Sequence, residues 1–214
     1  RDVFGIVPPN QRINLLSNPG FEEGSLGTGN SNAGSNGAII TDWVGVDCPN
    51  CAGDFFWDTS VKHSGINSVK LTTDGSKNYN IVLQGNDPLA PLEQGETYKL
   101  TGWMKSNLSS GQCTMDVVKW DNGALELTSG ISALRPTISG IMGWTNYSMD
   151  FTIPQGVTQT QFRVIQRPRG SANPVGDCWF DDMRLVKGVP EVSEKLITFT
   201  VFDASNNFTQ LSGV

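Results

Sequence analysis

The clearest hydrophobic pattern in the chain is an alternation of apolar and polar residues from Asn146 to Ile153. The apolar set is Tyr147, Met149, Phe151 and Ile153, and the polar set between them is Ser148, Asp150 and Thr152. Successive side chains of a β-strand point to opposite faces of the sheet, so this pattern predicts a half-buried strand.

Shorter segments of the same kind recur along the chain and are separated by turns rich in Gly, Pro and Asn. We predict further strands at 67–72, 79–84, 97–105, 113–120, 161–166 and 179–186. No segment keeps a 3.6-residue hydrophobic period over three turns, which argues against helices. Many short strands joined by turns are typical of an all-β sandwich or jelly roll.

The two ends of the chain differ from this pattern. Residues 1–12 contain Pro8-Pro9 without periodicity, and we expect a linker or an N-terminal extension there. The β-sandwich is predicted over 13–187. Residues 188–214 are expected to hold a linker and one more strand, Lys195 to Phe202. That strand either packs on this sandwich or begins a following module that resembles an immunoglobulin-like repeat.

Composition limits the classes of partner. The chain of 214 residues carries a net charge of −6 and scatters its 15 basic residues. Nucleic-acid binding draws much of its affinity from a basic surface, so a nucleic-acid partner is not expected. No apolar run approaches the roughly 20 residues that a membrane-spanning helix needs. Six Trp and ten Phe supply bulk for a core.

The four cysteines are Cys48, Cys51, Cys113 and Cys178. An even count in a chain rich in Asn, Ser and Thr favours a secreted or cell-surface protein. We prefer a local disulfide bond within Cys48-Pro-Asn-Cys51, and a second bond between Cys113 and Cys178 stays open among three pairings. A structural zinc site needs four ligands, and the one histidine, His63, makes zinc a poor alternative.

A series of motifs occurs along the chain in a familiar order. The motifs are Asn14 to Gly24 (NLLSNPGFEEG), Trp43, His63 to Leu71 (HSGINSVKL), Gly95 to Lys105 (GETYKLTGWMK), Trp144 to Tyr147 (WTNY) and Trp179 to Asp182 (WFDD). Together they resemble the carbohydrate-binding modules of families four, nine, sixteen and twenty-two, which share a galactose-binding-like jelly roll. The resemblance covers about Ile13 to Lys187.

The resemblance implies a function and a set of partners. It implies a non-catalytic module that targets a covalently linked polysaccharide-degrading enzyme to a β-linked glycan of the xylan, β-glucan or mannan class. The acidic net charge favours a neutral or weakly charged polymer. The alternatives are a structural or adhesin-like surface module and, less favoured, a glycoside hydrolase or lyase. Glu22-Glu23 and Asp181-Asp182 are adjacent pairs, whereas glycosidase carboxyls face each other across a cleft.

A structural calcium ion is also implied by the resemblance. Carried onto this chain, its ligands are the carbonyl of Gly20, the side chain of Glu22, turn carbonyls between Ser64 and Asn67, and Asp181. Calcium takes six to eight oxygen ligands, which such residues supply. Asp181 and Asp182 should point to opposite faces of their strand, so we expect only one of them to ligate. The alternative is that Glu22 and Asp181 only accept hydrogen bonds or form ion pairs.

Candidate glycan contacts follow from the same resemblance. Sugar rings stack on aromatic planes and their hydroxyls need donors and acceptors. The candidates are Tyr79, Trp120, Trp57, Gln84 and Gln166. Arg163 and Arg167 lie on the strand face opposite Gln166, so they should not contact a ligand that Gln166 contacts. The remaining tryptophans, Trp43, Trp103, Trp144 and Trp179, are expected in the core.

Overall fold

The computed structural model describes residues 13–26, 38–45, 54–76, 80–84, 92–121, 124–126, 135–158, 160–167, 169–188, 199–202 and 208–211. Every regular element within these residues is a β-strand. The strands are β1 Gly24–Leu26, β2 Ala38–Ile40, β3 Trp43–Gly45, β4 Asp54–Asp58, β5 Ser68–Asp74, β6 Asn80–Gln84, β7 Thr97–Ser110, β8 Gln112–Asp121, β9 Ala124–Glu126, β10 Thr137–Ile138, β11 Ile141–Thr152, β12 Thr160–Arg167, β13 Val175–Lys187, β14 Phe199–Phe202 and β15 Phe208–Leu211.

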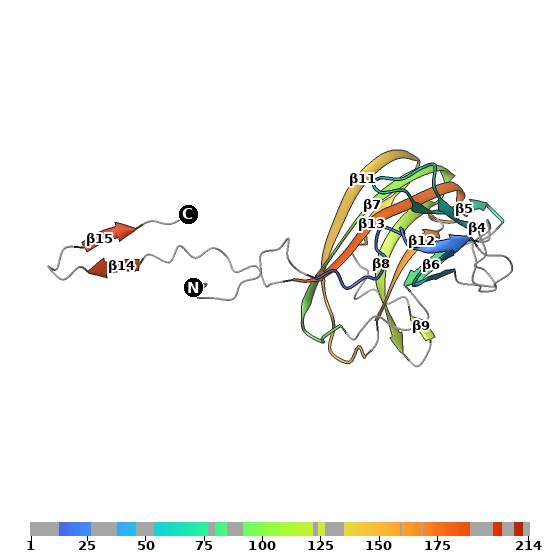
Figure 1. Cartoon of the computed structure of the whole chain (residues 1–214). Coiled ribbons are helices and arrows are strands. Elements are labelled where there is room, and N and C mark those ends of the chain that lie inside the picture. The colour runs from blue at the N-terminus through green and yellow to red at the C-terminus, as the bar shows by residue number, and fades with distance from the viewer. Residues whose placement is uncertain are drawn as a thin grey trace.

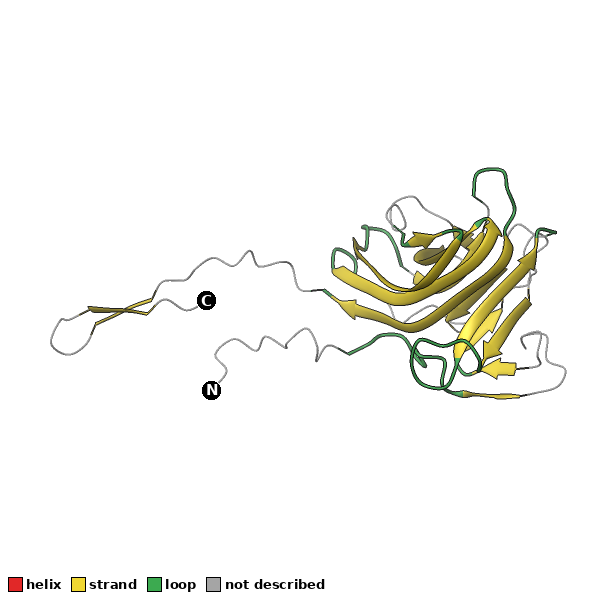
Figure 2. Ribbon diagram, turned by 90° about the horizontal axis from the view of Figure 1, so that it is seen from above, coloured by secondary structure: helices red, strands yellow, loops and turns green. Residues whose placement is uncertain are grey.

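Two antiparallel sheets pack face to face and form the sandwich (Figure 1). The first sheet has the strand order β10-β8-β12-β6-β3, with β9 paired to β8. The second sheet has the order β11-β7-β13-β5-β4, and its long strands curve along one side of the molecule (Figure 2). The prediction of an all-β sandwich is confirmed.

The core lies between the two sheets and is crossed by a disulfide bond. Cys113 on β8 is bonded to Cys178 on β13, so both side chains point inward. Alternation then places Met115 and Val117 of β8 inward as well, and both are fully buried in the core cluster. Trp43 joins this core and meets the Phe162 ring edge-on at 5.6 Å.

The outer face of the first sheet is also buried, but separately from that core. Val118 on β8 and Ile165 on β12 are 0% exposed, yet neither belongs to the cluster between the sheets. Their inward neighbours Val117 and Val164 do belong to it. The first sheet therefore carries two distinct sets of buried side chains, one on each face.

Strand β11 follows the predicted alternation. Met149, Phe151 and Ile153 are buried, whereas Asp150 and Thr152 are exposed. The bulge between Met142 and Thr145 shifts the register near the start of the strand.

Three tryptophans depart from their predicted place in the core. Trp103 of β7 lies between the inward residues Gly102 and Met104, and Trp179 of β13 lies between Cys178 and Phe180. Both therefore point away from the core, onto the outer face of the second sheet. Trp144 lies beside Trp103 because both rings contact His63. The expectation of a core position therefore holds for Trp43 and is wrong for the half-buried Trp103 and Trp144. Trp179 is buried as expected, at 6% exposure, but on the outer face of its sheet.

The chain ends bear on the predicted domain limits. The Leu15 N–H donates to the Leu185 carbonyl and the Gly188 N–H donates to Thr97, so both ends of the 13–187 range are tied to the sandwich. Strands β14 and β15 pair with each other as a separate two-stranded sheet. Residues 1–12 lie outside the described residues, and the limits of the domains stay a prediction.

Candidate functional site

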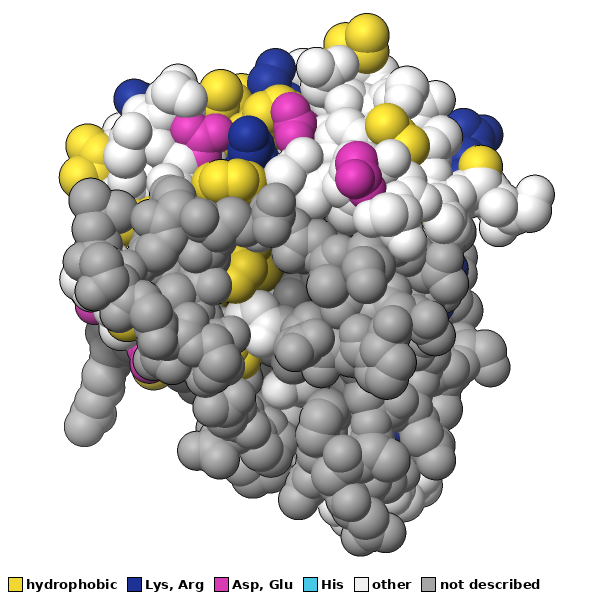
Figure 3. Space-filling view, turned by 90° about the vertical axis from the view of Figure 1, so that its right-hand side faces the viewer, with side chains coloured by type: hydrophobic (Ala, Val, Ile, Leu, Met, Phe, Trp, Pro, Cys, Tyr) yellow, Lys and Arg dark blue, Asp and Glu magenta, His cyan; other side chains and the backbone are white. Residues whose placement is uncertain are grey.

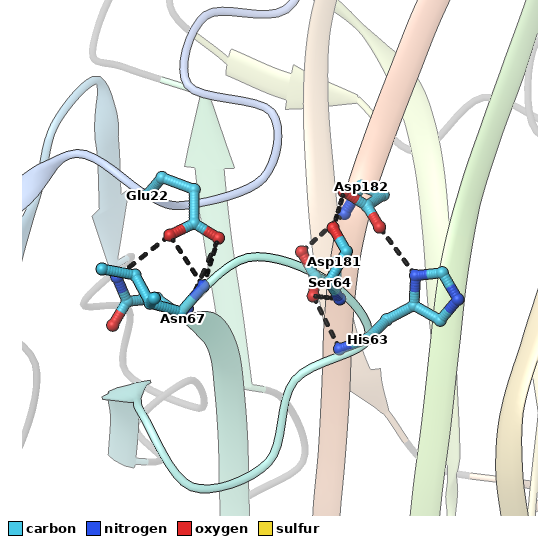
Figure 4. A network of polar contacts seen from close by, with 7 residues as sticks. Glu22, His63, Ser64, Asn67, Asp181 and Asp182 are labelled. Carbon is cyan, nitrogen blue, oxygen red and sulfur yellow. Dashed lines mark hydrogen bonds and ion pairs between the residues drawn. The ribbon is translucent and has the colours of Figure 1, made fainter.

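Glu22 connects the loop after Phe21 to the turn that precedes β5 (Figure 4). Its carboxylate accepts hydrogen bonds from the Ile66 N–H at 3.1 Å and from the side-chain amide of Asn67 at 3.3 Å. Gly65 lies against this carboxylate with a φ of +60°, and a Cβ there would stand 1.9 Å from Glu22 Oε1. The close approach of turn and carboxylate therefore requires glycine at this position.

Asp181 lies beside this turn on β13 and is fully buried. Its Oδ2 accepts hydrogen bonds from the backbone N–H groups of His63, at 2.8 Å, and Ser64, at 3.2 Å. Burial raises the pKa of Asp181 to about 6, although these hydrogen bonds act in the opposite direction. The chain thus places a carboxyl group where its charge is poorly compensated.

Asp182 takes part in the same cluster, contrary to the expectation that the two aspartates point to opposite faces of their strand. That only one of them would ligate calcium stays a prediction. A bulge between Asp181 and Arg184 and a positive φ of 48° at Asp182 interrupt the strand alternation. The Asp182 carboxylate contacts His63 Nδ1 at 2.7 Å and accepts a hydrogen bond from Ser64 Oγ at 2.9 Å (Figure 4). The His63 ring in turn stacks on Trp103 with centroids 3.7 Å apart.

The predicted calcium ligands come together in this cluster, but their arrangement meets the demands of calcium only in part. Glu22 and Asn67 share one set of hydrogen bonds and Asp181 and Ser64 another, both on the 63–67 turn, and a Cβ on Gly20 would lie 4.0 Å from Asp181 Oδ1. Carboxylate oxygens are the donors that calcium prefers. The 63–67 turn, however, points N–H groups toward both carboxylates, where the prediction requires carbonyls. Within the described residues no group of three or more His, Cys, Asp or Glu is arranged to hold a metal.

The aromatic candidates for glycan contact are placed as follows. Tyr79 lies outside the described residues. Trp120 pairs with Leu125 of β9 at the end of β8. Trp57 is half-buried, packs against the core cluster and donates its indole N–H to the Phe21 carbonyl. This hydrogen bond from Trp57 therefore attaches the loop that contains Glu22 to β4 of the second sheet.

The two glutamine candidates are buried and face inward. Gln166 pairs with Cys113 of the disulfide bond, is 0% exposed and donates its amide to the Gly176 carbonyl at 2.7 Å. Gln84 accepts a hydrogen bond from the Ser17 N–H and donates to the Asp42 carbonyl. Both amides therefore connect parts of the framework. Of the candidates whose side chains the structure describes, Trp57, Gln84 and Gln166, the two glutamines face the core.

A polar cluster on the outer face of the first sheet was missed from the sequence. Arg163 of β12, 1% exposed, donates from Nε and Nη2 to the two carboxylate oxygens of Asp116 on β8, which is 0% exposed. Arg135 also donates to Asp116 Oδ2, at 3.2 Å. The Arg163 guanidinium is thereby fixed in one plane on the outer face of the sheet.

Two polar atoms on the same face are buried and have no hydrogen-bond partner among the residues that the structure describes. They are the Gln161 side-chain oxygen and Arg167 Nε, which share the outward face of β12 with Arg163. Buried polar atoms are satisfied in the great majority of cases, so these two are exceptions among the described residues, as are Thr160 Oγ1 and Gln166 Oε1 on the inward face of β12. Alternation along β12 could have found this set had the Cys113–Cys178 bond been settled, since that bond fixes which face is inward.

Comparison with known protein families identifies the family of the chain. A family described as a carbohydrate binding domain, CBM_4_9, matches residues 13–171. The chain belongs to this family. The matched range includes β8, β12 and the outer-face cluster, whereas Asp181 and Asp182 lie beyond it. The chain is therefore a carbohydrate-binding module with a β-sandwich jelly roll. A search of curated protein sequences finds no match.

Solved structures share the fold at low sequence identity. The chain is similar to a structure described as "CBM4 structure and function", with 14% identity, a TM-score of 0.50 and coverage of 81% of this chain and 99% of that one. It is also similar to the enzymatically active domain of bacteriophage CBA120 tailspike protein 4, with 14% identity, a TM-score of 0.53 and coverage of 82% of this chain. The chain spans 22% of the length of that tailspike domain.

A third similar structure is an arabinose-bound GH51 α-L-arabinofuranosidase, with 16% identity and a TM-score of 0.52. The match covers 81% of this chain and 26% of the arabinofuranosidase. Neither enzyme's activity transfers at this identity and coverage. In the part of the chain that the structure describes, no helix has the length and apolar character needed to cross a membrane.

Proposed function

We propose that the chain binds a polysaccharide or oligosaccharide on the outer face of the first sheet. The observation that carries this proposal is the match of residues 13–171 to the carbohydrate binding domain family. The choice of this face is supported by its polar side chains outside the core, the Arg163–Asp116 pair and Gln161. Sugar hydroxyls both donate and accept, so hydroxyls of different sugars in one chain can satisfy Gln161 Oε1 and Arg167 Nε, whose residues lie about 20 Å apart along β12.

The module's place in a larger protein is part of the same proposal. We propose a non-catalytic role in which the module holds a linked polysaccharide-degrading enzyme on a β-linked glycan. The buried Cys113–Cys178 bond supports a secreted or cell-surface location, because disulfide bonds persist in oxidising compartments. On the end of the molecule shown in Figure 3, charged side chains of both signs lie among hydrophobic and uncharged ones, so no single charge dominates its described surface.

Affinity electrophoresis tests the proposal directly. The chain would be run in gels that contain xylan, mixed-linkage β-glucan, glucomannan or galactan, with bovine serum albumin as the unretarded reference. Retardation by at least one of these glycans is expected. Equal mobility in all gels, also with acidic glycans, would favour a structural or adhesin-like module.

We also propose that Glu22 and Asp181 take part in binding a structural calcium ion. Support comes from the convergence of two carboxylates from distant parts of the chain, one of them buried with a raised pKa. A cation would compensate the buried charge, but the 63–67 turn would have to present carbonyls in place of the N–H groups that it directs at both carboxylates.

A further inference from the structure

The outer face of the first sheet differs in charge from the chain as a whole. The chain has a net charge of −6. The arginines associated with this face are Arg135, Arg163, Arg167 and Arg169, and the carboxylate that its described strands place there is Asp116. Among the described residues of this face, basic groups therefore outnumber carboxylates, although the protein as a whole is acidic.

The basic groups lie in two rows across the sheet. Arg135 and Arg163 share one row, because both donate to Asp116. Arg167 pairs with Gln112 four residues further along β12, about 13 Å away at the usual strand rise. Arg169 lies on that side too, where its guanidinium donates to Ser139 Oγ, just after β10. Between the rows Thr114 and Thr137 form a hydroxyl pair at 3.3 Å.

On this face the described arginine side chains are more exposed than the carboxylate. Asp116 is completely buried, whereas 21% of the Arg135 side chain is exposed, Arg167 is half-buried and Arg169 is exposed. Among the described groups of this face, the guanidinium groups of Arg135, Arg167 and Arg169 are therefore more exposed than the carboxylate. Guanidinium groups bind carboxylates through two parallel hydrogen bonds, which gives both geometry and affinity.

We propose that this face recognises a carboxylate-bearing sugar, a uronate, within the bound glycan. The inference rests on the proposed function and adds the class of ligand. A uronate offers carboxylate oxygens to Arg167 and Arg169, and hydroxyl groups to the threonine pair between the two rows. Gln161 lies about 20 Å from Arg167 along β12, so it contacts a different sugar of the same glycan. It departs from the neutral polymer that the net charge favours, because a ligand on this face experiences the local charge more strongly than the distant acidic residues.

The test compares one polymer with and without its carboxylates. Binding of the chain to glucuronoxylan and to the same polymer after carboxyl reduction would be measured by isothermal titration calorimetry at 50 and 300 mM salt. We expect the acidic form to bind about tenfold more tightly at 50 mM salt, with the difference shrinking at 300 mM. Equal affinity for the two forms would overturn the proposal and leave glycan binding in place. Absence of binding to both, and to the neutral glycans above, would instead remove the proposed function.

Single substitutions test whether Arg167 is responsible for the preference for the acidic polymer. Arg167→Gln should lower the affinity for glucuronoxylan about tenfold and leave the affinity for the carboxyl-reduced polymer unchanged. Arg167→Lys, which keeps the charge, should restore part of the loss. Lys99→Gln is the matched control, because Lys99 is an exposed cation on the second sheet, paired with Asp150. An equal loss in Lys99→Gln, or binding of dextran sulfate as tight as that of glucuronoxylan, would show a general charge effect and overturn the proposal.

Discussion

Cys113 of β8 and Cys178 of β13 form a buried disulfide bond that joins the two sheets of the sandwich. The bond closes a sequence separation of 65 residues, and both cysteines are 0% exposed. It also decides the orientation of β12, because Gln166 pairs with Cys113 and must face inward with it. Arg163, an odd number of residues away, then faces outward.

Removal of this bond should destabilise the sandwich strongly. Closing a loop of this length lowers the entropy of the unfolded chain by an amount worth about 4 kcal/mol. The double substitution Cys113→Ala and Cys178→Ala should therefore reduce the free energy of unfolding by about that amount, measured by urea denaturation. The control is the same measurement on the reduced wild type, which should fall by a similar amount. A loss below about 1 kcal/mol would mean that packing alone holds the sheets together.

The strand pattern predicted the fold well because alternation depends on local sequence. The faces of β11, the turns and the two-layer class all follow from residues that are close in sequence, as at Met149 and Phe151. The direction of β12 could not be predicted, because both of its faces mix apolar and polar residues. Only its pairing with Cys113, a contact between distant residues, identifies the inward set.

The cluster around Asp181 shows a second limit. From the motifs we expected Glu22, Asn67 and Asp181 near one turn, and they lie there. The alternation of side chains along a strand led us to place Asp182 on the opposite face, but it contacts His63 of the same turn. A bulge that includes Asp182, with its left-handed backbone conformation, interrupts the alternation of side chains. Nothing in the sequence Trp-Phe-Asp-Asp predicts this bulge. Trp103 was misplaced for a related reason, since an aromatic residue on an outer sheet face is stabilised by a loop residue, His63, that lies far away in sequence.

The buried Asp181 predicts a specific dependence of stability on pH in metal-free protein. Its pKa is raised by burial to about 6 from 3.8, so the folded state binds the proton more tightly than the unfolded state. Its contribution is complete below the unfolded value and is lost as the pH rises through about 6. Between pH 4 and 7 the loss is up to about 3 kcal/mol. Urea denaturation of wild type and Asp181→Asn in EDTA should show the variant gaining relative to wild type as the pH rises. A constant difference would contradict this prediction.

Calcium would reverse the sign of that dependence. A bound cation holds Asp181 ionised, so stability would fall as the pH drops and protons compete with the metal. With 1 mM calcium at pH 7, the melting temperature should rise relative to EDTA, by an amount that grows with calcium concentration. Glu22→Gln should weaken this response, and magnesium serves as the control ion. An unchanged melting temperature after verified metal removal would leave Glu22 and Asp181 as acceptors of turn hydrogen bonds only.

The Arg163–Asp116 pair should show strong coupling in a double-mutant cycle. Removing one partner of a buried ion pair leaves an uncompensated charge, which typically costs about 3–5 kcal/mol. Arg163→Met alone should cost somewhat less than Asp116→Leu alone, since Arg135 still donates to Asp116 in the first variant. The double variant should return to within about 1–2 kcal/mol of wild type, because two apolar side chains of similar volume need no partner. The measurement is urea denaturation of all four proteins at pH 7. If the two single losses simply add in the double variant, the pair is not coupled, and the fixed orientation assigned to the Arg163 guanidinium fails with it.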